Sequence, residues 1–276
     1  MLAVIGGSGL AQLGNLEVRR RKRARTPYGK PSGALAFGCI ADCDVVFLAR
    51  HGDGHSIAPH EVNYRANLWA LKDAGASEVV AVAAVGAIRR DLEPGALLLP
   101  HQLIDYTWSR SSTYFEGSGA PVNHIDFTEP YSRELRARLL NAALACGERM
   151  VDGGTYAATQ GPRLETAAEI DRLERDGADV VGMTGMPEAA LAREISLQYA
   201  AITVVANYAA GRGDSRRSVP LERIGAVLVE KTLARPKPIT PDFVGLRIAD
   251  RFVFGCGMDA KGYWRNLPEI RAMKEG

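Results

Sequence analysis

Short apolar runs alternate with amphipathic segments along most of this chain. Apolar runs that stop at a glycine or at charged residues predict strands, and apolar residues three to four positions apart predict helices. The expected strands cover residues 2–5, 45–49, 78–85, 96–99, 102–106, 180–183 and 199–207. The expected helices cover residues 61–74, 133–145, 167–175, 188–194 and 221–233.

Strands that alternate with helices predict an α/β fold, with a mixed β-sheet flanked by helices on both faces. The polar motifs of the chain each follow a predicted strand, which is where open α/β sheets place their ligands. We therefore expect these motifs to share one site.

A cluster of prolines separates the two parts of the chain. Pro236, Pro238 and Pro241 cannot continue a helix and predict a linker. We expect one large domain over residues 1–235, followed by a linker and tail over residues 236–276.

Composition excludes several kinds of partner. A net charge of +2 argues against a bulk electrostatic partner, and the basic run Arg19–Arg25 has no interleaved aromatic residues. That run predicts a solvated strand or loop rather than a nucleic-acid site. No apolar run approaches the roughly 20 residues of a membrane span, and the amino terminus lacks the basic region of a signal peptide. We expect a cytoplasmic protein.

Neither the cysteines nor the histidines show the spacing of a metal site. Cys39 and Cys43 have no second pair of ligands, so all four cysteines are expected to be free thiols in a reducing compartment. His51, His55 and His60 are separated by glycines and a proline that would break a helix aligning them. We expect no metal.

Three motifs could bind phosphate. The backbone N–H groups of Gly6–Gly9 and the Ser8 hydroxyl could hold an anion, although Gln12 occupies the third glycine position of a dinucleotide motif. Arg50 would supply a planar fork and His51 an adjacent donor. Thr184 ends a Gly-Met-Thr turn, which on its own is a weak signal.

Leu164, Glu165 and Asn207 could form a slot for a flat heterocycle. Leu164 could cover one face of the ring, Glu165 can only accept hydrogen bonds, and Asn207 can donate and accept. A 6-oxopurine matches this pattern, whereas N1 of adenine would meet Glu165 lone pair to lone pair. No G-x-S-x-G motif is present, so positioning and charge stabilisation are expected instead of a covalent intermediate.

Several motifs together resemble one family. These are Ile5–Leu10, Thr26–Ser32, Leu48–Gly52, Val62–Asn67, Gln160–Arg163 and Gly182–Thr184. Over residues 1–235 the chain resembles the methylthioadenosine phosphorylase branch of the trimeric purine nucleoside phosphorylases. Asp105–Thr107, His124–Phe127 and Leu164–Thr166 are most similar to the bacterial S-methyl-5'-thioinosine phosphorylases within that branch.

The resemblance implies a role for each site residue. Phosphate would meet Ser8, Arg50, His51 and Thr184, and ribose would meet Met183. The base would contact Leu164, Glu165 and Asn207, with Glu165 and Asn207 as the catalytic pair. His124 would reach the 5' pocket of a neighbouring subunit, which implies a homotrimer, and Leu221 and Ile224 would line the methylthio end. Inorganic phosphate would be a co-substrate, and no cofactor is implied.

The expected reaction is phosphorolysis of S-methyl-5'-thioinosine to hypoxanthine and 5-methylthioribose 1-phosphate, in purine salvage. Adenine-using members of the family carry aspartates where Asn207 and Ala209 stand here. Alternatives are a methylthioadenosine or general 6-oxopurine nucleoside phosphorylase, or a nucleoside-binding protein whose catalysis has decayed. The last alternative is suggested by the unusual tail and by Ala83, which stands where the family usually has threonine or asparagine near phosphate and ribose.

The tail resembles a second family. Residues 241–246, 250–255 and 263–268 are similar to the carboxyl-terminal end of hypoxanthine phosphoribosyltransferases. The paired acidic residues and the Thr-Gly turn that hold phosphoribosyl diphosphate in that family are missing from this sequence. About 35 residues are also too few to bury a core. We expect a fused remnant that does not catalyse transfer.

Overall fold

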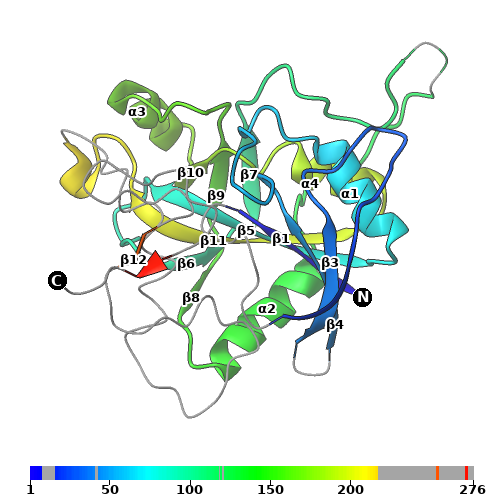
Figure 1. The fold of residues 1–276 in the computed structure, drawn as a ribbon. Helices are drawn as coiled ribbons and strands as arrows, with labels where there is room; N and C mark the ends of the chain where they lie inside the picture. Colours follow the sequence, from blue (N-terminus) through cyan, green and yellow to red (C-terminus); the bar gives the residue numbers. More distant parts are fainter. Residues whose placement is uncertain are drawn as a thin grey trace.

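One large β-sheet forms the centre of the protein, with helices packed around it (Figure 1). The computed structural model describes residues 1–7, 16–40, 43–117, 119 and 121–216, together with the backbone of 253–254 and 271–272. The predicted α/β fold with a mixed, helix-flanked sheet is confirmed.

The described part of the chain forms an 11-stranded sheet. Its main path runs β2-β3-β4-β1-β5-β10-β9-β7, while β11 pairs with β5 and β6, and β6 also pairs with β8. The strands are β1 (Leu2–Gly6), β2 (Glu17–Lys22), β3 (Leu35–Ile40), β4 (Cys43–Ala49), β5 (Glu78–Ala87), β6 (Leu97–Leu99), β7 (Gln102–Asp105), β8 (Met150–Asp152), β9 (Thr155–Ala158), β10 (Val180–Gly182) and β11 (Gln198–Tyr208). A separate antiparallel pair joins β12 (Val253–Phe254) to β13 (Arg271–Ala272).

Along one side of the central strand β5, the pairing with neighbouring strands is interrupted. On one side β11 pairs with it in parallel from Glu78 to Ala87. On the other side β1 pairs in parallel only as far as Ala81, and β10 pairs antiparallel only at Gly86 and Ala87. No described strand pairs with β5 on this second side between those two stretches. The ends of β1 and β10 therefore approach each other across a gap beside residues 82–85.

Local sequence signals set the ends of the helices α1 (Tyr64–Asp73), α2 (Arg133–Ala145), α3 (Ala167–Arg175) and α4 (Glu188–Glu194). The Asn63 and Ser132 side chains cap α1 and α2 by accepting from backbone N–H groups. Thr166 and Glu169 form a reciprocal capping box at the start of α3. A short 3-10 helix covers Gly213–Arg216.

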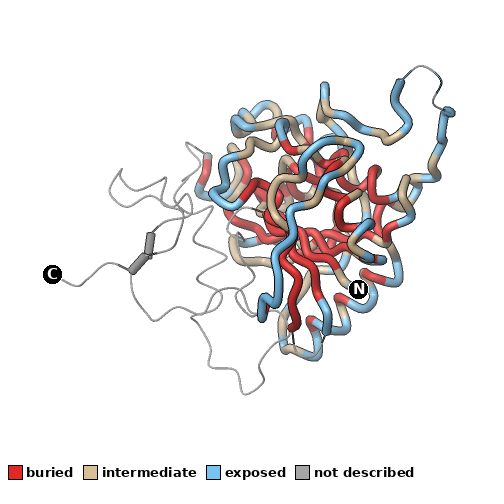
Figure 2. The backbone as a smooth tube through the Cα atoms, turned by 45° about the vertical axis from the view of Figure 1, so that its right-hand side comes forward, coloured by how far each residue is buried: buried red, intermediate tan, exposed pale blue. Residues whose placement is uncertain are grey.

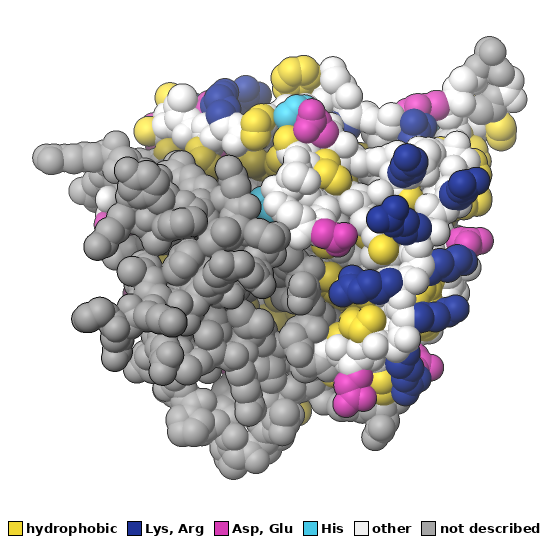
Figure 3. All heavy atoms as spheres, viewed as in Figure 1, with side chains coloured by type: hydrophobic (Ala, Val, Ile, Leu, Met, Phe, Trp, Pro, Cys, Tyr) yellow, Lys and Arg dark blue, Asp and Glu magenta, His cyan; other side chains and the backbone are white. Residues whose placement is uncertain are grey.

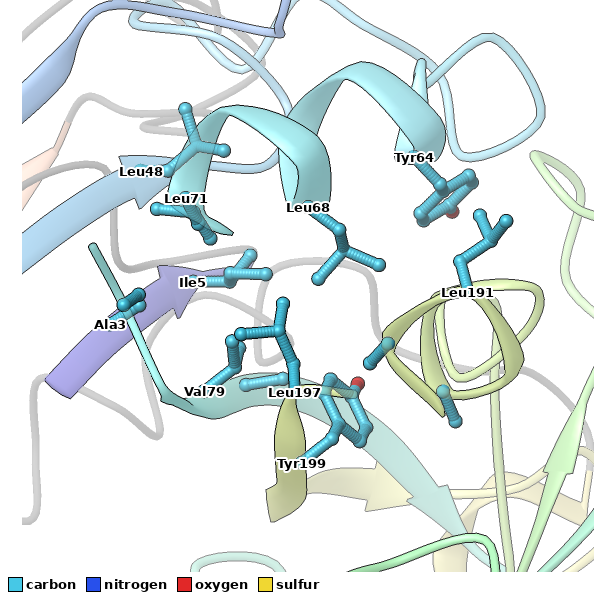
Figure 4. Packing of buried hydrophobic residues seen from close by; sticks show 14 of the residues in the cluster. Ala3, Ile5, Leu48, Tyr64, Leu68, Leu71, Val79, Leu191, Leu197 and Tyr199 are labelled. Carbon is cyan, nitrogen blue, oxygen red and sulfur yellow. The ribbon is translucent and has the colours of Figure 1, made fainter. Parts of the chain in front are cut away.

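Successive side chains of a strand point to opposite faces of the sheet, so a strand that is apolar throughout presents apolar side chains on both faces. Helices cover both of these faces. On one face (Figure 4), Val79 packs in a cluster with Leu68 and Leu71 of α1, Leu191 of α4, and Leu197 between α4 and β11. The neighbouring Val80 packs on the other face, in a separate cluster that contains Leu99, Leu135, Leu139 and Ala200. Alternate side chains of β5 thus anchor both helical layers.

Most predicted elements are confirmed. The bounds of α2, α3 and α4 are those expected, whereas α1 begins at Tyr64 rather than at residue 61 and β5 continues to Ala87. The strands β2, β3, β8 and β9 were not predicted as strands with these bounds. The helix predicted over 221–233, the linker near residue 236 and nearly all of the tail lie outside the described residues.

Two exposed segments stand out from this body. Every residue of the edge strand β2 is exposed, and Lys and Arg side chains gather along one edge of the face in Figure 3. The arm between β7 and α2 extends away from the buried centre (Figure 2). On this arm, Trp108 is 66% exposed and Val122 is 80% exposed. None of the helices in the described ranges is long and apolar enough to cross a membrane.

Candidate active site

A cavity of about 480 Å³ opens beside the gap in β5. The motifs that follow separate strands converge here, as the sequence predicted. Its lining includes Gly7 after β1, Arg50 and His51 after β4, Ala83 in β5, Met183 and Thr184 after β10, Asn207 in β11, and Leu164 and Glu165 after β9.

Arg50 is the most deeply buried charged side chain in this lining, with 1% of it exposed. Its Nε and Nη2 donate to the two carboxylate oxygens of Glu188 at 2.7 and 2.8 Å. Its Nη1 donates to the carbonyl of Val82 at 3.0 Å, within the gap where β5 has no strand partner on that side among the described residues. Arg50 therefore satisfies a backbone acceptor that the interrupted sheet leaves open.

Glu188 compensates the charge of Arg50. Its side chain is 0% exposed, and it also accepts a hydrogen bond from the Tyr199 hydroxyl at 2.8 Å. Burial alone lowers the pKa of Arg50, but the charge and hydrogen bonds of Glu188 outweigh it and raise the pKa above its usual range. Sequence reasoning missed Glu188, although its apolar neighbours on α4 are a signal that this face of the helix is buried.

His51 is 5% exposed, and its Nδ1 lies 2.8 Å from the carbonyl oxygen of Ile57. A carbonyl only accepts, so Nδ1 carries a hydrogen. Burial, and next the charge of Arg50, lower the pKa of His51 to about 3. The neutral ring therefore has an acceptor at Nε2, and the donor role expected toward phosphate applies only to a protonated ring.

Two further positions line the end of the cavity where phosphate is expected. Thr184 is buried, and its backbone N–H donates to the Tyr156 hydroxyl at 3.2 Å, so that N–H is not available to a ligand. Ala83 is 5% exposed and lines the same cavity with a methyl group. Ser8 lies outside the described residues. Gly7, the residue before it, lies so close to the backbone of β5 that an added Cβ would stand 2.5 Å from the Val82 oxygen.

At the end where the base is expected, Leu164, Glu165 and Asn207 line one cavity, as their pattern predicted. The Thr159 hydroxyl donates to Oε1 of Glu165 at 2.6 Å, which leaves the second carboxylate oxygen for a ligand. The Asn207 amide donates to the Tyr208 carbonyl at 2.6 Å and keeps its second hydrogen. Thr159 was not predicted, because its hydroxyl reaches Glu165 only through the fold of the loop.

The remaining expected residues are placed differently. Met183 lines the cavity beside Gly161, where an added Cβ would stand 2.4 Å from the Met183 sulfur. His124 is exposed on the arm and is not part of this chain's own cavity lining. Leu221 and Ile224 lie outside the described residues.

The described histidines, cysteines and carboxylates nowhere gather in a group of three that could hold a metal ion. The rings of His51 and His55 lie 4.6 Å apart. Cys39, Cys43 and Cys146 are free thiols, and Cys256 lies outside the described residues.

Replacing Glu188 by glutamine should strongly destabilise the fold. The Glu188→Gln variant keeps the shape of the side chain but leaves Arg50 as an uncompensated buried charge, at a cost of about 3–5 kcal/mol. Chemical denaturation monitored by circular dichroism measures this loss. Asp44→Asn is the matched control, because it breaks the exposed pair with Arg19 and should cost less than about 1 kcal/mol. Equal losses in the two variants would contradict the assigned role of Glu188.

Acid should weaken the fold through His51. Between its ordinary pKa of 6.5 and its folded pKa of about 3, the unfolded chain binds a proton that the folded chain excludes. The free energy of unfolding therefore falls as pH drops through this window, by up to about 1.4 kcal/mol per pH unit. His51→Asn should flatten this pH dependence, while His60→Asn, which removes an exposed histidine, should not. Parallel pH profiles for wild type and His51→Asn would refute the prediction.

Comparison with known proteins places this geometry in a family. The model of the phosphorylase superfamily matches residues 1–233. The "Probable S-methyl-5'-thioinosine phosphorylase" of Xanthomonas campestris is 52% identical over 226 residues, which cover 82% of this chain and 90% of that protein. The 6-oxopurine nucleoside phosphorylase of Pyrococcus furiosus is 46% identical, over 76% of this chain and 80% of that protein.

A solved structure agrees with the sequence relatives. Methylthioadenosine phosphorylase from Schistosoma mansoni, in complex with adenine, superposes with a TM-score of 0.78 at 32% identity. The match covers 83% of this chain and 86% of that one. The chain therefore belongs to the phosphorylase superfamily, and it is an enzyme of the purine nucleoside phosphorylase type.

Proposed function

We propose that this enzyme cleaves S-methyl-5'-thioinosine with inorganic phosphate, releasing hypoxanthine and 5-methylthioribose 1-phosphate. The observation that carries the proposal is that Glu165 and Asn207 line one cavity together with the phosphate-site residues Arg50 and Thr184. The name of the Xanthomonas relative supports the same substrate.

The base end supports a 6-oxopurine. Thr159 occupies one oxygen of Glu165, and the other can accept N1–H of hypoxanthine. The second amide hydrogen of Asn207 can donate to O6 or N7, where negative charge builds as the glycosidic bond breaks. Ala209, which also lines the cavity, provides no second carboxylate for an adenine amino group.

Arg50 and His51 can hold the attacking phosphate. A guanidinium has five N–H donors, and the bonds to Glu188 and Val82 use three of them, so one remains on each Nη atom. The neutral ring of His51 accepts the hydrogen of a hydrogen phosphate ion at Nε2, and the Thr184 and Ser8 hydroxyls add donors. Ala83 supplies no hydrogen bond. We therefore expect phosphate to bind more weakly, by roughly 0.5–1.5 kcal/mol, than it would with threonine or asparagine at this position.

The chemical step then needs positioning and charge stabilisation. Phosphate held by Arg50 approaches C1' of the sugar as the bond to the purine lengthens and the sugar becomes an oxocarbenium-like cation. The negative phosphate stabilises that cation, while Asn207 and Glu165 stabilise the departing base. The bond between C1' and a phosphate oxygen forms as the bond between C1' and N9 breaks, and the purine leaves as an anion that takes a proton from water at N7 or N9. The proton on N1 stays in place, and no covalent enzyme intermediate forms.

Wild-type enzyme should prefer S-methyl-5'-thioinosine over S-methyl-5'-thioadenosine by at least about tenfold in kcat/KM, because each unpaired buried polar group costs about 1–3 kcal/mol. Release of free base, followed by ultraviolet absorbance with and without phosphate, measures this ratio. Asn207→Asp should shift the ratio toward the adenine substrate. Equal or better use of the adenine compound by wild type would reject the 6-oxopurine assignment.

General 6-oxopurine nucleoside phosphorolysis is the second candidate, favoured by the name of the Pyrococcus relative. The two candidates share one base pocket and differ at the 5' end, where the expected residues Leu221 and Ile224 lie outside the described part. Inosine tested beside the methylthio substrate separates them, because the general enzyme would use both with similar kcat/KM.

The arm supports assembly into a trimer. Arg65 and Glu194 hold its root through contacts with Glu116, Thr113 and Tyr114, while its outer part carries the exposed His124. Because His124 is not in the cavity lining of its own chain, we propose that the arm reaches the cavity of a neighbouring subunit and that His124 completes the 5' pocket there.

Mixing two defective variants tests this assembly. His124→Ala lacks the donated residue and Asn207→Ala lacks the base contact, so each alone should show strongly reduced activity. Co-refolded mixtures should recover activity, because some cavities then combine an intact Asn207 with a neighbour's intact His124. Light scattering should give the mass of three chains. A monomeric mass, or a mixture no more active than the separate variants, would rule out the shared site.

A further inference from the structure

Arg110 bridges two loops of the cavity, a role that the residues assigned so far do not fill. It lies half-buried at the root of the arm. Its Nη1 donates to the backbone carbonyls of Met183 and Met186 at 2.8 and 2.6 Å. Its Nη2 donates to the carbonyls of Thr159 and Gln160 at 3.2 and 2.7 Å.

These four carbonyls belong to two segments with different ligands. The base loop, residues 159–165, follows β9 and carries Leu164 and Glu165. The phosphate loop, residues 183–186, follows β10 and carries Met183 and Thr184. One rigid guanidinium fork therefore sets the spacing between the wall that meets the purine and the wall that meets phosphate and ribose.

Two short connections lead from Arg110 to the reacting groups. Arg110 holds the Thr159 carbonyl, and the Thr159 hydroxyl donates to Glu165 at 2.6 Å. On the other side it holds the carbonyl of Met183, the residue directly before Thr184. A displacement of the guanidinium would shift both walls together.

The surroundings of Arg110 also differ from those of Arg50. No described carboxylate lies within ion-pairing distance of Arg110, whose other acceptors are the Gln160 side chain at 3.2 Å and the Tyr64 hydroxyl at 3.3 Å. Its hydrogen bonds end on groups without charge, so the arrangement depends on the two loops keeping their carbonyls turned inward. A ligand that orders one loop therefore also favours the bonded position of the other.

We propose that Arg110 is a positioning residue that couples purine binding to phosphate binding. This inference rests on the proposed function, because it takes the purine and phosphate to occupy the cavity described above. Arg110 does not touch the reacting atoms; it makes each ligand raise the affinity for the other by ordering the shared frame.

Calorimetric titration of hypoxanthine, with and without saturating phosphate, tests the coupling. In wild type we expect phosphate to tighten hypoxanthine binding by roughly 5-fold or more, and hypoxanthine to tighten phosphate binding by the same factor. Arg110→Met should lower this factor to about 1. In this variant kcat should also fall, by a larger factor than the KM of either substrate rises. Arg133→Met, which removes an exposed arginine of α2, should keep the wild-type factor.

Two further variants separate positioning from simple loss of fold. Arg110→Lys keeps the charge but cannot span both loops, so we expect a folded protein without coupling. Added ethylguanidinium should restore coupling in Arg110→Ala. Wild-type coupling in Arg110→Met, no coupling in wild type, or unfolding of both Arg110→Met and Arg110→Lys would each overturn the inference. Should wild type bind adenine instead of hypoxanthine, the 6-oxopurine assignment fails and the same titration is made with adenine.

Discussion

The buried ion pair between Arg50 and Glu188 is the interaction on which this site depends. On one side, the central strand β5 lacks a described strand partner beside residues 82–85, and the cavity opens next to that gap. A gap in a buried sheet leaves backbone acceptors open, and Arg50 satisfies one of them at Val82. A guanidinium can stay there only because Glu188 compensates its charge. The same pair therefore fixes the position of Arg50 in the cavity lining.

The two arginines of the site act through different surroundings. Arg50 is fully buried and paired with a carboxylate, so it offers directed N–H groups with little net charge. Arg110 is half-buried, is bonded to carbonyl oxygens and joins the loops that would hold the purine and phosphate. Electrostatic preorganisation of this kind suits a reaction in which charge develops at several places at once.

Our proposal divides recognition of the substrate between distant parts of the protein. It assigns base selection to Glu165 and Asn207, which line one chain's cavity beside the alanines at 83 and 209. It assigns recognition of the 5' end to His124, which is exposed on the arm that extends away from the buried centre (Figure 2). Base preference and 5' preference can therefore change independently, because separate side chains determine them.

The sequence by itself determined the helices α2, α3 and α4, most strands and the meeting of motifs at strand ends, because hydrophobic period and capping residues are local signals. It left strand and loop open for β2, whose residues are all exposed, and it missed β3 and the three- and four-residue strands β8 and β9. Only the tertiary structure decided the gap in β5, the pairing of Arg50 with a glutamate 138 residues away, and the bonds of Arg110. Those features depend on which distant segments pack together, since the burial of a charged group becomes favourable only when its partner arrives with it.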